Sequence, residues 1–313
     1  MTHRVFIDGE AGTTGLQIRE RLAKRRDIAI VEIDPARRKD QSARAGALNE
    51  ADVAILCLPD DAAREAAALV TNPKTKIVDP STAHRIAPGW TYGFPEAGFR
   101  EAIRQSARVS NPGCYSTGAI ALLKPLVEGG LVPPTWPVTI DAVSGYSGGG
   151  KAMIAEFEDK TSPEYTDVPY RIYALGLAHK HVPEIQRHAG LSHPPLFAPA
   201  VGRYAQGMIV EVPLPLHALP GAPTPVQVHA ALADAYAGER FVEVVSLTQA
   251  AALKTLAPEA LNDTNRMQLF VFANAGTGQA RLVALLDNLG KGASGAAVQN
   301  MNLVLGLDEG EGL

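Results

Sequence analysis

The sequence predicts an α/β fold in two domains, a parallel-sheet domain and an α+β domain with a mixed or antiparallel sheet. Two observations lead to this prediction. In the first part of the chain, short apolar runs alternate with stretches of helical spacing, which is typical of a parallel sheet with crossover helices. After residue 135, longer strand-like runs follow one another, which is typical of an antiparallel or mixed sheet.

The individual elements follow from the spacing of the apolar residues. In the first part we expect strands at 4–8, 28–33, 53–58 and 76–79, and helices at 14–24 and 60–70, the second capped by Asp60. In the second part we expect strands at 138–144, 205–212, 226–230, 267–273 and 279–287. The stretch 292–307 has the spacing of an amphipathic helix that packs back on the first domain. The predicted domains are therefore residues 1–114 with 290–313, and residues 115–289.

Composition narrows the class of protein. Of the 313 residues, 46% are hydrophobic and 20% are charged, and the net charge is −4, which gives no electrostatic argument for a nucleic-acid partner. No apolar run reaches the roughly 18 residues of a membrane span, and we see no signal peptide before the first strand. Two cysteines do not make a disulfide framework, so we expect a reducing, cytoplasmic location.

A glycine-rich loop lies between the first predicted strand and the first predicted helix. It reads Gly9-Glu10-Ala11-Gly12-Thr13-Thr14-Gly15. Backbone N–H groups at a helix start bind phosphate, and glycine allows the pyrophosphate to approach. The loop predicts a Rossmann-type dinucleotide site formed by Gly9, Gly12, Thr13, Thr14 and Gly15.

The end of the second predicted strand should face the adenosine ribose. Asp34 there favours NAD, whereas Arg37, Arg38 and Lys39 favour the 2′-phosphate of NADP. The three basic residues favour NADPH/NADP as the cofactor. A solvated basic loop is the alternative.

Cys114 is the candidate nucleophile. It follows the turn residues Asn111-Pro112-Gly113 and precedes a helical stretch, which places it at a helix N-terminus. The helix dipole and free N–H groups there lower the pKa of a thiol and can hold an oxyanion. Cys57, inside an apolar strand, fits an inert buried cysteine.

The segment Ala178-His179-Lys180-His181-Val182-Pro183-Glu184 offers an acid–base partner for the thiolate. His179 and His181 share a face of an extended segment, and Glu184 can orient one of them. Which histidine serves as the acid is left open. A metal site is not favoured, because no further His or Cys stands nearby at a zinc-like spacing.

A second glycine-rich loop, Ser144 to Lys151, follows the strand predicted at 138–144. Glycines followed by a lysine can form an anion-binding nest. We expect Ser144, Gly148, Gly149 and Lys151 to contact a substrate phosphate. A flexible loop is the alternative.

Four ordered motifs together resemble the N-acetyl-γ-glutamyl-phosphate reductases, specifically the shorter of two subtypes. They are Asn111 to Tyr115, Ser144 to Lys151, His179 to Glu184, and the C-terminal stretch Asp287-Asn288-Leu289-Gly290-Lys291-Gly292-Ala293-Ser294-Gly295-Ala296-Ala297-Val298-Gln299-Asn300. The resemblance implies a semialdehyde dehydrogenase-like fold, with a Rossmann domain completed by the C-terminal helix and a sheet used in dimerisation. It also implies a homo-oligomer (dimer or tetramer) and a role for Asn288 at the cofactor.

The activity that the resemblance implies is a step of arginine biosynthesis. N-acetyl-γ-glutamyl phosphate is reduced by NADPH to N-acetylglutamate 5-semialdehyde, with release of phosphate, through a thioester on Cys114. A small-molecule acyl phosphate is then the partner, with no nucleic acid or membrane. The alternatives are an aspartate-semialdehyde dehydrogenase, an aminoadipate-phosphate reductase, or a non-catalytic dinucleotide sensor. A sensor would need neither Cys114 nor the His179–Glu184 segment.

Overall fold

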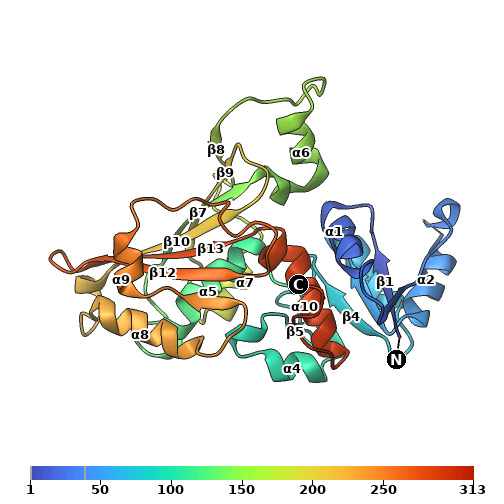
Figure 1. Cartoon of the computed structure of the whole chain (residues 1–313), viewed down its shortest axis with the longest axis horizontal. Coiled ribbons are helices and arrows are strands. Elements are labelled where there is room, and N and C mark those ends of the chain that lie inside the picture. The colour runs from blue at the N-terminus through green and yellow to red at the C-terminus, as the bar shows by residue number, and fades with distance from the viewer. Residues whose placement is uncertain (1, 39) are drawn as a thin grey trace. The chain divides into compact units, whose positions relative to one another are not determined.

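The computed structural model describes residues 2–38 and 40–313. Contacts within the chain divide it into two compact units, whose elements are labelled in Figure 1. The first unit comprises Met1–Gly113 and Ala293–Leu313, and the second comprises Cys114–Gly292. The chain therefore enters the second unit at Cys114 and returns to the first unit just before its last helix.

The first unit contains a six-stranded sheet in which all pairings are parallel, in the order β2-β1-β3-β4-β6-β5. All four residues of β3 are buried, as expected for a parallel strand covered on both faces. The carboxyl ends of the strands lie along one edge, where such sheets bind ligands. The strands are β1 (His3–Asp8), β2 (Ile28–Ile30), β3 (Val53–Leu56), β4 (Lys76–Asp79), β5 (Thr91–Tyr92) and β6 (Arg108–Ser110).

Five α-helices accompany this sheet, and two details of them differ from the prediction. All ten residues of the last helix are buried, because it packs against α4, α1 and β4, so it is not amphipathic. Asp60 does not cap α3; Pro59 is the N-cap, and the Asp60 carboxylate accepts a hydrogen bond from the backbone N–H of Thr82 (3.0 Å). The helices are α1 (Thr13–Leu22), α2 (Gln41–Glu50), α3 (Asp60–Leu69), α4 (Arg100–Gln105) and α10 (Gly295–Val304), with 3₁₀ turns η1 (Pro35–Arg37) and η2 (Pro95–Ala97).

The second unit contains a seven-stranded mixed sheet in the order β11-β12-β13-β10-β7-β9-β8. Antiparallel pairings join β12, β13, β10 and β7, whereas β7 pairs with β9 in parallel. This confirms the mixed sheet expected after residue 135. The strands are β7 (Thr139–Gly145), β8 (Tyr170–Ile172), β9 (Leu196–Gly202), β10 (Met208–Pro215), β11 (Val242–Val244), β12 (Met267–Asn274) and β13 (Gln279–Leu286).

The strand predicted at 226–230 is wrong, because these residues lie in helix α8. Thr224 and Gln227 form a capping box before it, and Pro225 occupies its first turn. The alternating valines of this segment are compatible with a strand or with a helix. The capping box stabilises the start of the helix. The helices of the second unit are α5 (Cys114–Glu128), α6 (Gly150–Glu158), α7 (Val182–His188), α8 (Pro225–Ala235) and α9 (Leu247–Ala252), with short turns η3 (Tyr146–Gly149), η4 (Leu216–Ala218) and η5 (Gly290–Ser294).

Helix α5 is the central helix of the second unit and carries Cys114 at its start. Eleven of its residues are buried, and it packs against β13, β10, α7 and α8. A Cβ atom at Gly118 would lie 2.9 Å from Cγ2 of Val210, so glycine there permits close packing against β10. Across the described ranges, no helix has both the length and the apolar character that a bilayer crossing requires.

Candidate active site

Cys114 is the first residue of α5 and is partly exposed. The helix has no acidic residue in its first turn, so no carboxylate there neutralises the positive end of its dipole. The first N–H groups of a helix have no partner within it and favour a nearby anion. The same groups can stabilise a thiolate on Cys114 and an oxyanion formed at a carbonyl that the sulfur attacks.

Cys57 is in a different environment. It follows β3, and its backbone N–H donates to the carbonyl of Asp8 (2.8 Å). Burial raises the pKa of its thiol, and the negative charges of Asp79 and Asp8 add to this effect. The thiolate form is therefore suppressed at Cys57, which agrees with the inert role expected for it.

The two histidines of the motif lie beside Tyr115, the residue that follows Cys114. The ring centroid of Tyr115 is 5.9 Å from that of His179 and 5.8 Å from that of His181. The His181 ring is buried, and His181 is the N-cap residue of α7, which packs against α5. The structure thus brings His179, His181 and the start of α5 together within the second unit.

A chain of hydrogen bonds fixes the His179 ring. Nδ1 of His179 accepts from the backbone N–H of His181 (3.1 Å), so a neutral ring carries its proton on Nε2. Nε2 lies 3.4 Å from the hydroxyl of Tyr173, which donates to the hydroxyl of Tyr115 (3.1 Å). The Tyr115 hydroxyl in turn donates to the carbonyl of Ala200 (3.1 Å). Both nitrogens of His179 therefore have partners in this chain.

The two tyrosines remain protonated in this chain. Burial raises the pKa of Tyr173 to about 12 and also raises the pKa of Tyr115. A negative charge on Cys114 raises the pKa of both phenols further. The sequence argument missed both residues, although Tyr115 follows Cys114 directly and Tyr173 precedes the histidine segment by six positions.

Glu184 is buried, and its carboxylate accepts a hydrogen bond from the hydroxyl of Ser116 (2.8 Å) in the first turn of α5. This bond joins α7, which follows the histidine segment, to the helix that carries the nucleophile. The role expected for Glu184, which is to orient a histidine, stays a prediction. Among residues 2–38 and 40–313, no three His, Cys, Asp or Glu side chains are grouped so that they could hold a metal ion.

Part of the second glycine-rich loop also meets this cluster. Ser144 is buried near the end of β7, and its hydroxyl interacts with that of Tyr115. A Cβ atom at Gly148 would lie 3.3 Å from Oγ of Ser144. Lys151 is exposed in the first turn of α6, and Gly149 packs against Met153. Ser144 and Gly148 are therefore close to the nucleophile's helix, and an anion contact from Lys151 stays a prediction.

Asn288 organises the same loop. Its Oδ1 accepts from the backbone N–H of Gly207 (2.7 Å), and its Nδ2 donates to Oγ of Ser147 (3.1 Å). The side chain is buried, with both halves of the amide engaged inside the second unit. The role expected for Asn288 at the cofactor stays a prediction.

The first glycine-rich loop fits a dinucleotide phosphate. Gly9 has φ +85°, and a Cβ there would lie 2.2 Å from the carbonyl oxygen of Cys57. A Cβ at Gly15 would lie 2.8 Å from the carbonyl oxygen of Gly9, so the turn requires both glycines. Gly12 is the N-cap of α1 and provides no side-chain cap, and Oγ1 of Thr13 is buried without a hydrogen-bond partner. An anion at this helix start could accept hydrogen bonds from the Thr13 hydroxyl and from the backbone N–H groups of the first turn.

The acidic residues after β2 already have partners. The Asp34 carboxylate accepts from the backbone N–H of Ala36 (2.9 Å), and Glu32 pairs with Arg19 (2.6 Å). Arg37 and Arg38 are exposed, and Arg37 lies 3.5 Å from the Asp40 carboxylate. Lys39, the third basic residue of this segment, lies outside the described residues.

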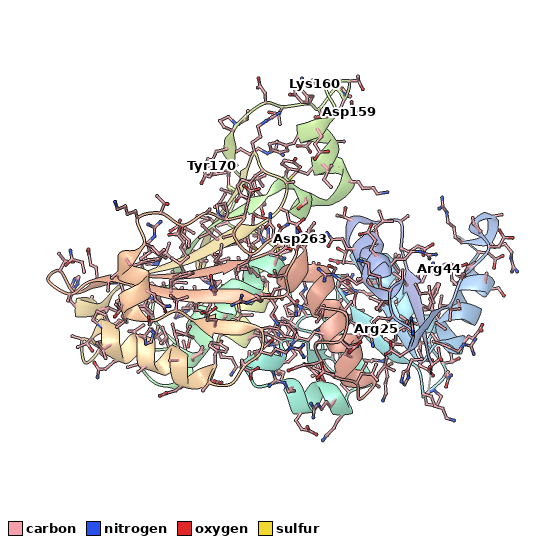
Figure 2. The ribbon with its side chains drawn as sticks, in the orientation of Figure 1. Arg25, Arg44, Asp159, Lys160, Tyr170 and Asp263 are labelled. Carbon is pink, nitrogen blue, oxygen red and sulfur yellow. The ribbon has the colours of Figure 1, made fainter. Side chains whose placement is uncertain are left out.

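At the end of β1, the buried carboxylate of Asp8 pairs with Arg44 of α2 (2.8 Å), one of the residues labelled in Figure 2. This ion pair joins the residue before Gly9 to α2. It therefore fixes the start of the glycine-rich loop relative to the helix that follows the basic segment.

Comparison with known proteins identifies the family. Residues 4–106 match the family model described as semialdehyde dehydrogenase, NAD binding domain, and residues 114–288 match the one described as semialdehyde dehydrogenase, dimerisation domain. An N-acetyl-γ-glutamyl-phosphate reductase of Brucella anthropi is 55% identical, covering 98% of this chain and 99% of its own. One of Trichormus variabilis is 54% identical, covering 99% of both. The chain belongs to the N-acetyl-γ-glutamyl-phosphate reductases.

Solved structures extend the likeness of fold beyond this family. An aspartate semialdehyde dehydrogenase II of Vibrio cholerae aligns with a TM-score of 0.68 at 17% identity, covering 97% of this chain and 99% of its own. A probable aspartate-semialdehyde dehydrogenase of Pseudomonas aeruginosa aligns with a TM-score of 0.70 at 16% identity, covering 97% and 99%. These similarities show a common fold. The assignment to the N-acetyl-γ-glutamyl-phosphate reductases rests on the closer relatives.

The two cysteines are expected to differ sharply toward an alkylating agent. Iodoacetamide at neutral pH should label Cys114 in preference to Cys57, because burial suppresses the thiolate of Cys57. Peptide mapping by mass spectrometry after a short exposure measures the two rates in one sample. Labelling of a Cys114→Ser variant gives the background, and equal labelling of both cysteines in the unmodified protein would contradict the assignment.

Proposed function

We propose that this chain reduces N-acetyl-γ-glutamyl phosphate to N-acetylglutamate 5-semialdehyde with NADPH, through a thioester on Cys114. The observation that carries the proposal is the position of Cys114 at the start of α5, beside the two histidines and two tyrosines of the hydrogen-bond chain. Nucleophilic catalysis needs a sulfur held near an acid–base group and near oxyanion donors. The second unit supplies all three, and the family relatives supply the substrate.

The first half-reaction is acyl transfer to sulfur. A histidine takes the proton of the Cys114 thiol, and the thiolate attacks the carbonyl carbon of the acyl phosphate. The carbon–oxygen bond to phosphate breaks, and the departing phosphate takes up the proton that the overall reaction consumes. N–H groups at the start of α5 stabilise the oxyanion that forms during this attack.

The second half-reaction releases the aldehyde. A dinucleotide held at the glycine-rich loop Gly9–Gly15 would provide the hydride that reduces the thioester carbonyl. Cys114 then holds a thiohemiacetal oxyanion in the same N–H site. As this intermediate collapses, the histidinium returns its proton to the departing sulfur, which restores the thiol and the neutral imidazole. Two moderate steps thus replace one difficult displacement of phosphate by hydride.

We assign the acid–base role to His181. The His179 ring accepts a backbone N–H at Nδ1 and faces Tyr173 at Nε2, so a proton transfer there would disturb the chain that holds it. His181 is buried at the start of α7, and its ring lies 4.7 Å from that of His179, centroid to centroid. In this assignment His179 and Tyr173 position the catalytic group.

The substrate is tested directly by following the oxidation of NADPH with N-acetyl-γ-glutamyl phosphate. We expect Cys114→Ser to lower kcat by about 10³-fold or more, because the covalent route is lost. Cys57→Ser is the matched control and should keep the wild-type rate. Faster phosphate-dependent oxidation of aspartate semialdehyde, or of the aminoadipate analogue, than of N-acetylglutamate semialdehyde would overturn the proposed substrate.

The two histidines should respond differently to substitution. We expect His181→Asn to lower kcat by about 10²- to 10⁴-fold, the usual contribution of a general acid–base group. His179→Asn should lower kcat less and leave the pH dependence of kcat intact, because this residue positions rather than transfers. The pH profiles of both variants at saturating substrate measure this, and the reverse order of effects would reject the assignment.

We also propose that the enzyme prefers NADPH to NADH. In dinucleotide sites an acid after the second strand binds the ribose hydroxyls of NAD, whereas arginines accommodate a 2′-phosphate. Here Asp34 caps η1 and Glu32 pairs with Arg19, while Arg37 and Arg38 are exposed in the same segment. The engaged acids and the exposed arginines both favour a phosphate.

Replacing Arg37 and Arg38 together by alanine should raise the KM for NADPH about tenfold, which corresponds to about 1.4 kcal/mol of lost phosphate binding. The KM for NADH should change less than twofold, because NADH lacks the 2′-phosphate. Initial rates with each cofactor measure the difference. Lys24→Ala together with Arg26→Ala, two exposed basic residues just after the first unit's first helix, is the charge-matched control. A parallel loss for both cofactors would contradict the proposal.

Two further features belong to this proposal. We expect a homo-oligomer, a dimer or a tetramer, formed through the second unit, because its family model is described as a dimerisation domain. We place the reaction in the cytoplasm, because a catalytic thiol needs a reducing compartment and neither cysteine of the described residues forms a disulfide.

A further inference from the structure

The C-terminal motif Asp287–Asn300 is a part of the molecule to which the proposed reaction assigns no role. Nearly all of its residues are buried, including Lys291, Gln299 and Asn300. Its first half lies in the second unit and its second half lies in the first unit. Each half contacts the chain segment that contains the nucleophile.

In the second unit, Gly292 packs directly against Cys114. A Cβ atom at Gly292 would lie 2.7 Å from Cβ and 3.2 Å from Cα of Cys114. The backbone N–H of Gly292 donates to the carbonyl of Asp287 (2.9 Å), which fixes the turn. Gly292 does not have a positive φ, so lack of space, and not backbone conformation, requires glycine here.

In the first unit, Asn300 holds Asn111, three residues before the nucleophile. Nδ2 of Asn300 donates to Oδ1 of Asn111 (2.9 Å) and to the carbonyl of Gly93 (2.9 Å). Both asparagine side chains are fully buried. Buried amide groups are costly to leave without partners, so this contact strongly favours one position of Asn111.

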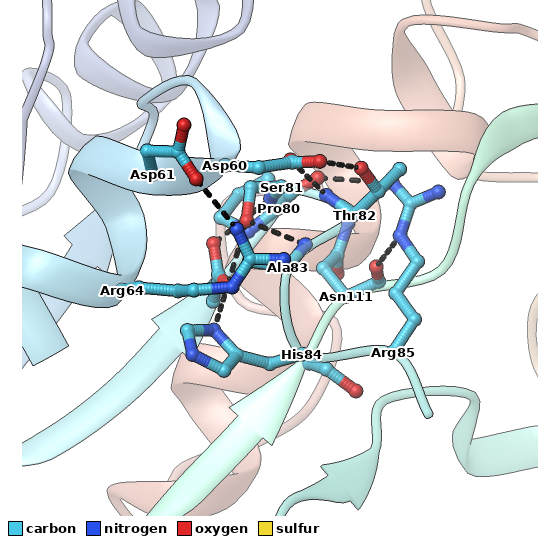
Figure 3. Close-up of polar contacts among 12 residues, drawn as sticks. Asp60, Asp61, Arg64, Pro80, Ser81, Thr82, Ala83, His84, Arg85 and Asn111 are labelled. Atoms are coloured by element: carbon cyan, nitrogen blue, oxygen red, sulfur yellow. Dashed lines mark hydrogen bonds and ion pairs between the residues drawn. The ribbon is translucent and has the colours of Figure 1, made fainter. Parts of the chain in front are cut away.

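The remaining polar groups of Asn111 are also bonded. Its backbone N–H donates to the carbonyl of Asp79 (2.8 Å), and its Nδ2 donates to the carbonyl of Ala293 (3.0 Å). Its carbonyl accepts from Nε of Arg85 (3.1 Å), a bond drawn in Figure 3. The segment that leads into α5 is therefore anchored through every polar group of one residue.

We propose that Gly292 and Asn300 are positioning residues for Cys114. Gly292 sets the place of the Cys114 Cβ, and Asn300 fixes the segment Asn111–Gly113 from which the helix begins. A nucleophile displaced by about 1 Å can lose about 10²-fold in rate, so both contacts act on the chemical step. This inference rests on the proposed thioester mechanism, because it assigns these residues to the reactivity of that sulfur.

Asn302 provides a matched control for Asn300. It lies in the same helix and is equally buried, but its Oδ1 accepts from Arg25 (2.5 Å) and its Nδ2 donates to the carbonyl of Glu311 (2.9 Å). Arg25, labelled in Figure 2, also donates to the carbonyl of Glu311 (3.1 Å). Asn302 therefore anchors the end of the chain and not the segment before Cys114.

The experiment compares Asn300→Asp with Asn302→Asp in the full-length protein. Aspartate keeps the shape of the side chain but cannot donate from the position of Nδ2. Three quantities are measured: kcat with the acyl phosphate, the pH midpoint of Cys114 alkylation by iodoacetamide, and the thermal unfolding temperature. Both variants should lose thermal stability. Only Asn300→Asp should lower kcat by about 10- to 100-fold and raise the alkylation midpoint.

Gly292→Ala and Gly290→Ala form a second pair. A Cβ at Gly290 would lie 2.2 Å from the carbonyl oxygen of Thr264, so this substitution strains the same turn without pressing on Cys114. Gly292→Ala should lower the alkylation rate of Cys114 about tenfold or more, and Gly290→Ala should leave it within about twofold. This pair decides the question if Asn300→Asp does not fold.

The proposal would be overturned if the two variants of each pair changed kcat and the alkylation of Cys114 equally. Such a result would show that Asn300 and Gly292 have a purely structural role. The alkylation measurement needs no substrate. If the unmodified protein failed to turn over the acyl phosphate, the proposed function would fail, while the alkylation comparison would still decide whether these residues position the sulfur.

Discussion

The buried helix α5 is the constraint on which the rest of the second unit depends. It packs against three strands and two helices, and Gly118 allows its backbone to approach β10 closely. Because the helix is fixed along its length, its first turn holds Cys114, Tyr115 and Ser116 in set positions. The N–H groups of that turn, at the positive end of the helix dipole, then provide the electrostatic environment that a thiolate and an oxyanion need.

The polar groups around this helix start form one connected arrangement. Burial keeps Tyr115 and Tyr173 protonated, so they can act as donors in a chain that runs from His179 to the carbonyl of Ala200. A hydrogen-bond chain with a fixed direction determines which nitrogen of His179 carries the proton. Two histidines that are equivalent in the sequence thereby acquire different environments.

The first unit illustrates how a common phosphate-binding turn is adapted. The glycine-rich loop requires Gly9 and Gly15 because neighbouring backbone atoms occupy the space of their side chains. The acids that follow β2 are engaged in a cap and in an ion pair, and Arg37 and Arg38 are exposed in the same segment, with Arg37 3.5 Å from the Asp40 carboxylate. Local hydrogen bonding of the acids thus agrees with the preference for NADPH that the basic residues of the sequence predict.

Local patterns in the sequence were sufficient for the parallel and mixed sheets, for the glycine-rich loop before α1 and for the helix start at Cys114. Pro-Gly before a cysteine and a helical run after it specify that start without any tertiary contact. The local pattern failed at 226–230, where alternating valines fit a strand as well as a helix and the capping box at Thr224 determines the outcome.

Only the tertiary structure could decide which distant residues meet. Tyr173 reaches Tyr115 across 58 positions, and Asn300 reaches Asn111 across 189. The tertiary structure also buries every residue of α10, although the spacing of its apolar residues predicted an amphipathic helix. Such contacts depend on which elements pack together and on the cost of leaving buried polar groups without partners. Neither quantity is contained in the periodicity of a single segment, so the sequence alone determined the helix start at Cys114 and the structure determined what surrounds it.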